Sequence, residues 1–247
     1  MRCTRLFAFI FSLLAAVLLS GSAFGDNMTF VGPGGNNSGG EYTYPYNFMI
    51  NGVPAALLCD AFDNHISNGE TWKANENPIP GGTGLFGSTS SADYLAAGLI
   101  FDTILGVNGV TLPGTVTANS NDANWAIWSL FSSTALNDIN SGNSSSPFGN
   151  SGNSNALSYY NWALSAAAVP PPATDFAGIV VYTPVAGSQS GDHGTPQEFL
   201  GYTPPGHSNN VPEPSELSFL GILALAGAGG FAFRKQLAPK LAIAVQQ

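Results

Sequence analysis

The sequence predicts an α+β domain in which antiparallel strands, arranged as a sheet or a barrel, flank a block of about three helices. Short segments with strand character occupy both ends of this domain, within residues 28–74 and 176–201. Segments with helical spacing are confined to the middle, within residues 92–168. This order differs from the regular alternation of strand and helix that a parallel α/β sheet requires. An N-terminal signal helix and a C-terminal transmembrane helix are expected outside the domain.

The strands are predicted from short apolar runs and from alternation of apolar with polar residues. Residues 42–50 alternate aromatic and polar side chains, and Asn51-Gly52, which follows, is a dipeptide typical of a tight hairpin turn. The returning strand is therefore expected at residues 55–59. The predicted strands cover residues 28–31, 42–50, 55–59, 69–74, 176–183 and 197–201, with a further β-like stretch at 107–117.

The helices are predicted from 3.6-residue spacing and from their end signals. Ser90-Ser91-Ala92-Asp93 has the form of a capping box, and Gly106 is a natural stop for the helix that follows. Asn121 is expected to cap the second helix, and the third must end before Pro170. The predicted helices cover residues 92–105, 121–131 and 155–168.

The N-terminus has the three parts of a secretory signal peptide. Arg2 and Arg5 supply positive charge, residues 6–19 form an apolar core, and small residues follow. We expect signal peptidase to cleave after Gly25, which makes residues 1–25 the signal peptide; cleavage after Ala23 is the alternative.

The C-terminal segment combines a proline-rich motif, an apolar run and a basic stop. The apolar run at residues 217–233 is long enough for a short membrane-spanning helix, and Arg234 and Lys235 would hold its end at the cytoplasmic face. Residues 203–210 would link it to the domain at 26–202, and residues 236–247 would form a short tail. The motif that precedes the run is Val211, Pro212, Glu213, Pro214 and Ser215.

This order of parts resembles the PEP-CTERM sorting signal of exported bacterial proteins, over about the last tenth of the chain. The resemblance implies cleavage by an exosortase-type membrane protease, after anchoring in the inner membrane through the C-terminal helix. It also implies a final location at the cell surface or outside the cell, in bacteria that make exopolysaccharide. Exopolysaccharide and other surface components are therefore candidate partners. The tail at residues 236–247 departs from such signals, which usually end soon after the basic residues.

The charge of the exported part excludes one large class of partners. Residues 26–210 contain thirteen acidic residues and one basic residue, Lys73, which gives a net charge of −12 with histidine neutral. Such a surface repels phosphate, so no nucleic-acid partner is expected. The segment from Asp60 to His65 offers carboxylates and an imidazole, but its spacing matches no known metal motif. We therefore predict no metal and no cofactor.

The exported domain retains a single cysteine, because Cys3 lies in the signal peptide and only Cys59 remains. A lone cysteine cannot form an internal disulfide. Four fragments together resemble the thioester domains of bacterial adhesins, in which a strand cysteine condenses with the glutamine of a helical Gln-x-Ala-Ile-Trp motif. Here that glutamine position is occupied by Asn124, followed by Trp-Ala-Ile-Trp. The four fragments cover residues 59–62, 69–72, 126–131 and 196–199.

The resemblance therefore implies a thioester-like pair, Cys59 and Asn124, that lacks the bond. Asparagine is one methylene shorter than glutamine, so we expect packing between the two residues and a hydrogen bond at most. An intact thioester is the alternative; it would lower the mass of the domain by one ammonia.

These observations favour a non-enzymatic exported surface or extracellular-matrix protein with no catalytic residues. A carbohydrate-active or other secreted hydrolase is the alternative, and it would need a pair of carboxylates or a triad. Asp60 and Asp63 are the only close acids beside a histidine. An ice-binding surface protein is a further alternative; it would need regular threonine arrays, of which Thr115-Val116-Thr117 is a single instance.

Overall fold

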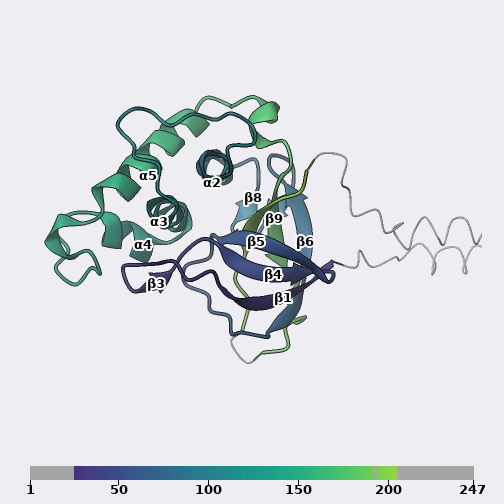
Figure 1. Cartoon of the computed structure of the whole chain (residues 1–247). Coiled ribbons are helices and arrows are strands. Elements are labelled where there is room, and N and C mark those ends of the chain that lie inside the picture. Colours follow the sequence, from purple (N-terminus) through teal and green to yellow (C-terminus); the bar gives the residue numbers. More distant parts are fainter. Residues whose placement is uncertain (1–24, 192–193, 205–247) are drawn as a thin grey trace, which may run out of the picture. The chain divides into compact units, whose positions relative to one another are not determined.

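The folded part of the chain is a closed antiparallel β-barrel with helices packed together on one side of it (Figure 1). The computed structural model describes residues 25–191 and 194–204. The predicted α+β class is confirmed, and the strands form a barrel rather than an open sheet. The expected signal helix and transmembrane helix lie outside the described residues. Among the residues that are described, no helix is both long and apolar enough to span a membrane.

Six strands close the barrel in the order β1-β4-β5-β10-β9-β6, with β6 pairing back onto β1. All six pairings are antiparallel. Closure leaves none of these strands with an unpaired edge, which protects them from pairing with other chains. The barrel strands are β1 (Asp26–Pro33), β4 (Tyr46–Ile50), β5 (Val53–Cys59), β6 (Thr71–Pro78), β9 (Ile179–Pro184) and β10 (Phe199–Tyr202).

The turn between β4 and β5 is the two-residue hairpin that the sequence predicts. Ile50 pairs with Val53, and the two residues between them, Asn51 and Gly52, have φ values of 51° and 83°. Positive φ at both central positions matches the right-handed twist of the flanking strands, and asparagine and glycine tolerate it best. This turn fixes the register of β5 and therefore the direction in which Cys59 points.

Two short hairpins lie almost entirely outside the predicted strands. The first joins β2 (Asn37–Ser38) and β3 (Glu41–Tyr42), and the second joins β7 (Thr83–Gly84) and β8 (Gly87–Ser88). The predicted strand at 42–50 is also too long, because β4 begins only at Tyr46. The β-like stretch predicted at 107–117 contains no strand.

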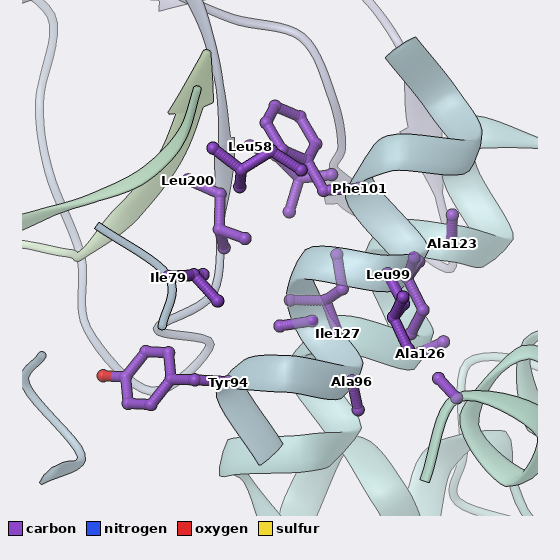
Figure 2. Packing of buried hydrophobic residues seen from close by; sticks show 14 of the residues in the cluster. Leu58, Ile79, Tyr94, Ala96, Leu99, Phe101, Ala123, Ala126, Ile127 and Leu200 are labelled. Atoms are coloured by element: carbon purple, nitrogen blue, oxygen red, sulfur yellow. The ribbon is translucent and has the colours of Figure 1, made fainter. Parts of the chain in front are cut away.

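Successive residues of the barrel strands contribute to two separate hydrophobic clusters, because side chains alternate between the two faces of a strand. Leu57, Cys59 and Phe199 belong to the cluster inside the barrel. Leu58 and Leu200 belong to the cluster between the barrel and the helices. Figure 2 shows these two leucines on the strand side of the second cluster, facing side chains from the helices.

Four α-helices are present among the described residues, one more than predicted. The additional helix, α4, is short and follows directly after α3; Ser132 caps it by accepting from the amide of Ala135 at 3.3 Å. Ser91, not Ser90, precedes α2, and its side chain makes no capping hydrogen bond. Asn119, not Asn121, caps α3. The helices are α2 (Ala92–Leu105), α3 (Ser120–Phe131), α4 (Ser133–Ile139) and α5 (Ser154–Ala167), with 3-10 turns η1 (Gly149–Ser151) and η2 (Ala173–Phe176).

Candidate functional site

The structure brings Cys59 and Asn124 into direct contact. The side-chain amide nitrogen of Asn124 donates a hydrogen bond to the backbone carbonyl of Cys59 at 3.0 Å. The side-chain oxygen of Asn124 accepts from the backbone amide of Tyr44 at 2.8 Å. Both Cys59 and Asn124 are completely buried. The Asn124 side chain therefore links α3 to the backbone at Cys59 and at Tyr44. Its hydrogen bond to Cys59 is made with the main-chain carbonyl and not with the thiol.

Local sequence places both residues. Cys59 is the last residue of β5, and its inward direction follows from the register set at the Asn51-Gly52 turn. Asn124 lies in the second turn of α3, whose start is fixed where the Asn119 side chain accepts from the amide of Asn121 at 2.9 Å. The middle of α3 is buried on every side, since this helix packs against α2, α4, α5 and β5.

The Cys59 thiol is held in its neutral form. Burial raises the pKa of this thiol well above its ordinary value, and the neighbouring Asp60 carboxyl raises it further whenever it is ionised. The nearby Trp128 indole and the backbone amide of Ala61 lower the thiol pKa, but burial outweighs them. Because the thiolate is the nucleophilic form of cysteine, Cys59 is expected to be a poor nucleophile in the folded domain.

Aromatic side chains enclose this contact. Phe62 lies 5.4 Å from Trp125 and 5.1 Å from Trp128, measured between ring centroids. Phe199 packs at 4.7 Å against Phe48 in the barrel interior. The four fragments of residues 59–62, 69–72, 126–131 and 196–199 thus contribute to one connected region of the core.

A pair of buried acids lies next to Cys59, immediately beyond the paired ends of β5 and β10. Asp60 follows Cys59, Glu198 precedes Phe199, and the amide of Asp60 donates to the carbonyl of Glu198 at 3.2 Å. Both acidic side chains are completely buried. They face the layer between the barrel and the helices, where Leu58 and Leu200 also lie.

The Glu198 carboxylate is held by two donors. The hydroxyl of Tyr94, on α2, donates to one oxygen at 2.5 Å. The backbone amide of Leu85, at the tip of the β7–β8 hairpin, donates to the other at 2.6 Å. The amide of Phe86 in turn donates to the Tyr94 hydroxyl at 3.0 Å. The hairpin therefore closes over the acid pair.

Asp60 has a different environment. Neither of its buried oxygens makes a hydrogen bond of normal geometry within the described part of the chain. Burial raises the pKa of Asp60 well above its ordinary value, and the neighbouring Glu198 carboxylate raises it further. Two like charges this close are unfavourable in a medium of low polarity, so Asp60 retains its proton beside Glu198.

This acid pair could not be identified from the sequence, because strand pairing between β5 and β10 joins residues that are far apart in the chain. The acids that sequence proximity suggested, Asp60 and Asp63, do not act together: Asp63 is exposed, as is His65, whereas Asp60 is buried. Within residues 25–191 and 194–204, no group of three or more potential metal ligands is found together. The predicted sorting motif (Val211 to Ser215) and the stop residues Arg234 and Lys235 lie outside the described residues.

Comparisons with family models, with curated proteins and with solved structures each found no match to this chain.

Proposed function

We propose that the chain is a non-enzymatic exported surface or extracellular-matrix protein whose domain is a thioester-like module without the thioester. The observation that supports this most directly is the Asn124 amide, which is engaged at both ends by backbone of Cys59 and Tyr44. A glutamine would extend about 1.5 Å further, the length of one carbon–carbon bond, and could bring its carboxamide carbon to the Cys59 sulfur. With asparagine, a hydrogen bond takes the place of the covalent bond.

Export and sorting are proposed from the two ends of the sequence. Residues 1–25 have the order of a signal peptide, which signal peptidase would remove. Residues 211–235 have the order of a sorting signal, with an apolar segment between the Pro-Glu-Pro motif and two basic residues. An exosortase-type membrane protease would act on it, and the domain would reach the cell surface or the extracellular matrix.

A secreted hydrolase is the second candidate, because Asp60 and Glu198 form the carboxyl pair that such an enzyme needs. Against it, both side chains are completely buried, and both Glu198 oxygens already accept hydrogen bonds from Tyr94 and Leu85. A substrate could reach the pair only if the β7–β8 hairpin moved away. Hydrolysis of a secreted polymer that disappears in the Glu198→Gln variant would favour this candidate.

Intact mass of the protein recovered from cells tests the proposal. We expect loss of the signal peptide, trimming near Pro212 to Pro214, and a domain mass that matches the sequence with no ammonia lost. Methylamine should leave this mass unchanged, and denaturation should expose one titratable thiol. A mass short by one ammonia that methylamine restores would instead show that the thioester exists.

The Asn124→Gln variant tests the thioester-like origin of the pair. In that variant the Cys59 sulfur would attack the carboxamide carbon, a sulfur–carbon bond would form, the carbon–nitrogen bond would break, and ammonia would leave with the thiol proton. We expect a fraction of this variant to lose one ammonia and to react with methylamine. A folded Asn124→Gln protein whose mass equals that calculated from its sequence would contradict the interpretation of Cys59 and Asn124 as a thioester-like pair.

A further inference from the structure

A groove of about 450 Å³ crosses the helical side of the domain and shares no residue with the Cys59–Asn124 contact or the acid pair. It lies between the loop after α2, the C-terminal part of α5 and the proline-rich segment that leads into η2. Its volume is within the range of sites that hold small ligands or single side chains. We propose that this groove binds a lysine or arginine side chain of a partner polypeptide.

Both rims of the groove are fixed by contacts within the domain. The completely buried carboxylate of Asp102 accepts from the backbone amides of Asn108 at 2.9 Å and Val110 at 3.0 Å, which holds the loop on one side. The Asn108 side chain donates to the backbone carbonyl of Asp175 at 3.3 Å and so ties this loop to η2. Residues 170–172 are three successive prolines, whose φ angles are restricted by their rings. The groove is therefore formed before any ligand arrives.

The walls suit a long aliphatic stem. Leu99, Val110, Ala166 and the three prolines contribute apolar surface to the lining. Lysine and arginine side chains bury their methylene groups along such surfaces while the charged group stays near a polar partner. The groove thus offers contact to the stem as well as to the charge.

The polar groups of the groove favour a cation. Asp175 supplies a half-buried carboxylate, and no basic residue is among those that line the groove. The net charge of −12 over residues 26–210 attracts basic partners and repels anionic ones. Trp162, which is half-buried and forms part of the wall, adds an aromatic surface that attracts an ammonium or guanidinium group.

The test uses the full chain, purified in a nonionic detergent, and two probes: a tetralysine peptide with blocked ends and the neutral sugar maltohexaose. Isothermal titration calorimetry measures the affinity, because its signal does not depend on Trp162, which two of the variants replace. We expect tetralysine to bind, with an affinity that falls as salt is added. Asp175→Asn should weaken this binding by about tenfold or more, since a charge-assisted contact is lost. Trp162→Leu should weaken it severalfold, and Trp162→Phe should retain part of the affinity.

Asp63→Asn is the matched control, because it removes the same charge from an exposed site outside the groove. This control should keep its affinity for tetralysine within about twofold, as expected for a distant surface charge. An equal loss in Asp63→Asn and Asp175→Asn would overturn the proposal in favour of diffuse electrostatic attraction. Failure of tetralysine to bind would also overturn it, as would binding of maltohexaose alone through Trp162, which would identify a neutral sugar site instead.

Discussion

Asp60 and Glu198 lie side by side at the ends of the neighbouring strands β5 and β10, completely buried, with the amide of Asp60 donating to the carbonyl of Glu198 at 3.2 Å. The two carboxyls are treated differently by their surroundings. Tyr94 and Leu85 donate to Glu198, whereas neither Asp60 oxygen receives a hydrogen bond of normal geometry within the described residues. Asp60 therefore keeps its proton in the folded domain. This makes the free energy of unfolding of the domain depend on pH.

We predict that the domain loses stability as pH rises from about 4 through neutrality. The folded chain keeps the Asp60 proton, because burial and Glu198 raise the Asp60 pKa, while the unfolded chain releases it near its ordinary pKa. Stability is therefore greatest below the unfolded pKa and falls as pH approaches the folded pKa, by up to about 1.4 kcal/mol per pH unit. Asp60→Asn, which is neutral at every pH, should reduce this slope and stabilise the domain at neutral pH. Denaturant unfolding at pH 5 and pH 8 measures both effects.

The test compares how steeply stability changes with pH in the wild type and in Asp60→Asn, because other acids also make stability fall as pH rises. Burial also raises the pKa values of Glu76, Asp93 and Asp138. Asp63→Asn is the control, since Asp63 is exposed and its replacement should leave the slope as in wild type. Equal slopes for wild type and Asp60→Asn would contradict the retained proton.

Removal of the Asn124 side chain should destabilise the domain strongly. Asn124→Ala leaves the carbonyl of Cys59 and the amide of Tyr44 buried without their present partner. Each unsatisfied buried group costs about 1–3 kcal/mol, so we expect a loss of about 2–5 kcal/mol in the free energy of unfolding. Asn161→Ala is the matched control, because Asn161 is exposed on α5 and should change stability by less than about 0.5 kcal/mol. Similar losses of unfolding free energy in both variants would show that the hydrogen bonds of Asn124 to Cys59 and Tyr44 do not stabilise the domain.

The features that the sequence predicted well are those set by local chemistry. The Asn51-Gly52 turn, the helix that ends at Gly106 and the third helix before Pro170 depend on residues that restrict or permit particular backbone angles. The contact between Cys59 and Asn124 came from a motif resemblance, and periodicity alone would not have paired a strand end with a helix.

The features that the sequence did not predict depend on tertiary contacts. The β7–β8 hairpin has only two residues in each strand, and its tip is held by Glu198 and Tyr94 rather than by its own apolar pattern. Helix α4 is short and largely polar, so its spacing carries little signal. The acid pair depends on the pairing of β5 with β10, which no local pattern indicates.

The Cys59 thiol should resist alkylation in the folded domain. It is completely buried, and its pKa is raised well above that of a free cysteine, so the reactive thiolate is almost absent at pH 8. We expect iodoacetamide to modify Cys59 only as fast as the domain opens, and to modify it at once in denaturant. Peptide mapping by mass spectrometry distinguishes Cys59 from Cys3 if the signal peptide is retained. Rapid labelling of Cys59 in the native protein would contradict the buried, neutral thiol.

The β7–β8 hairpin can approach the acid pair because Gly84 has no side chain. A Cβ atom at this position would overlap the hydroxyl and ring of Tyr94, the residue that donates to Glu198. Gly84→Ala must therefore displace the hairpin or Tyr94, and we expect a loss of about 1–3 kcal/mol in stability, as for other overpacked sites.

Hydrogen exchange at Leu85 provides a local measurement of the same change, because its amide donates to Glu198 in the wild type. This amide should exchange faster in Gly84→Ala. Gly114→Ala is the control: a Cβ there meets no atom within 4 Å, and the backbone is outside the positive-φ region, so its stability should be unchanged or slightly higher. If Gly84→Ala retained both its stability and the slow exchange of the Leu85 amide, the hairpin would not depend on this close approach to Tyr94.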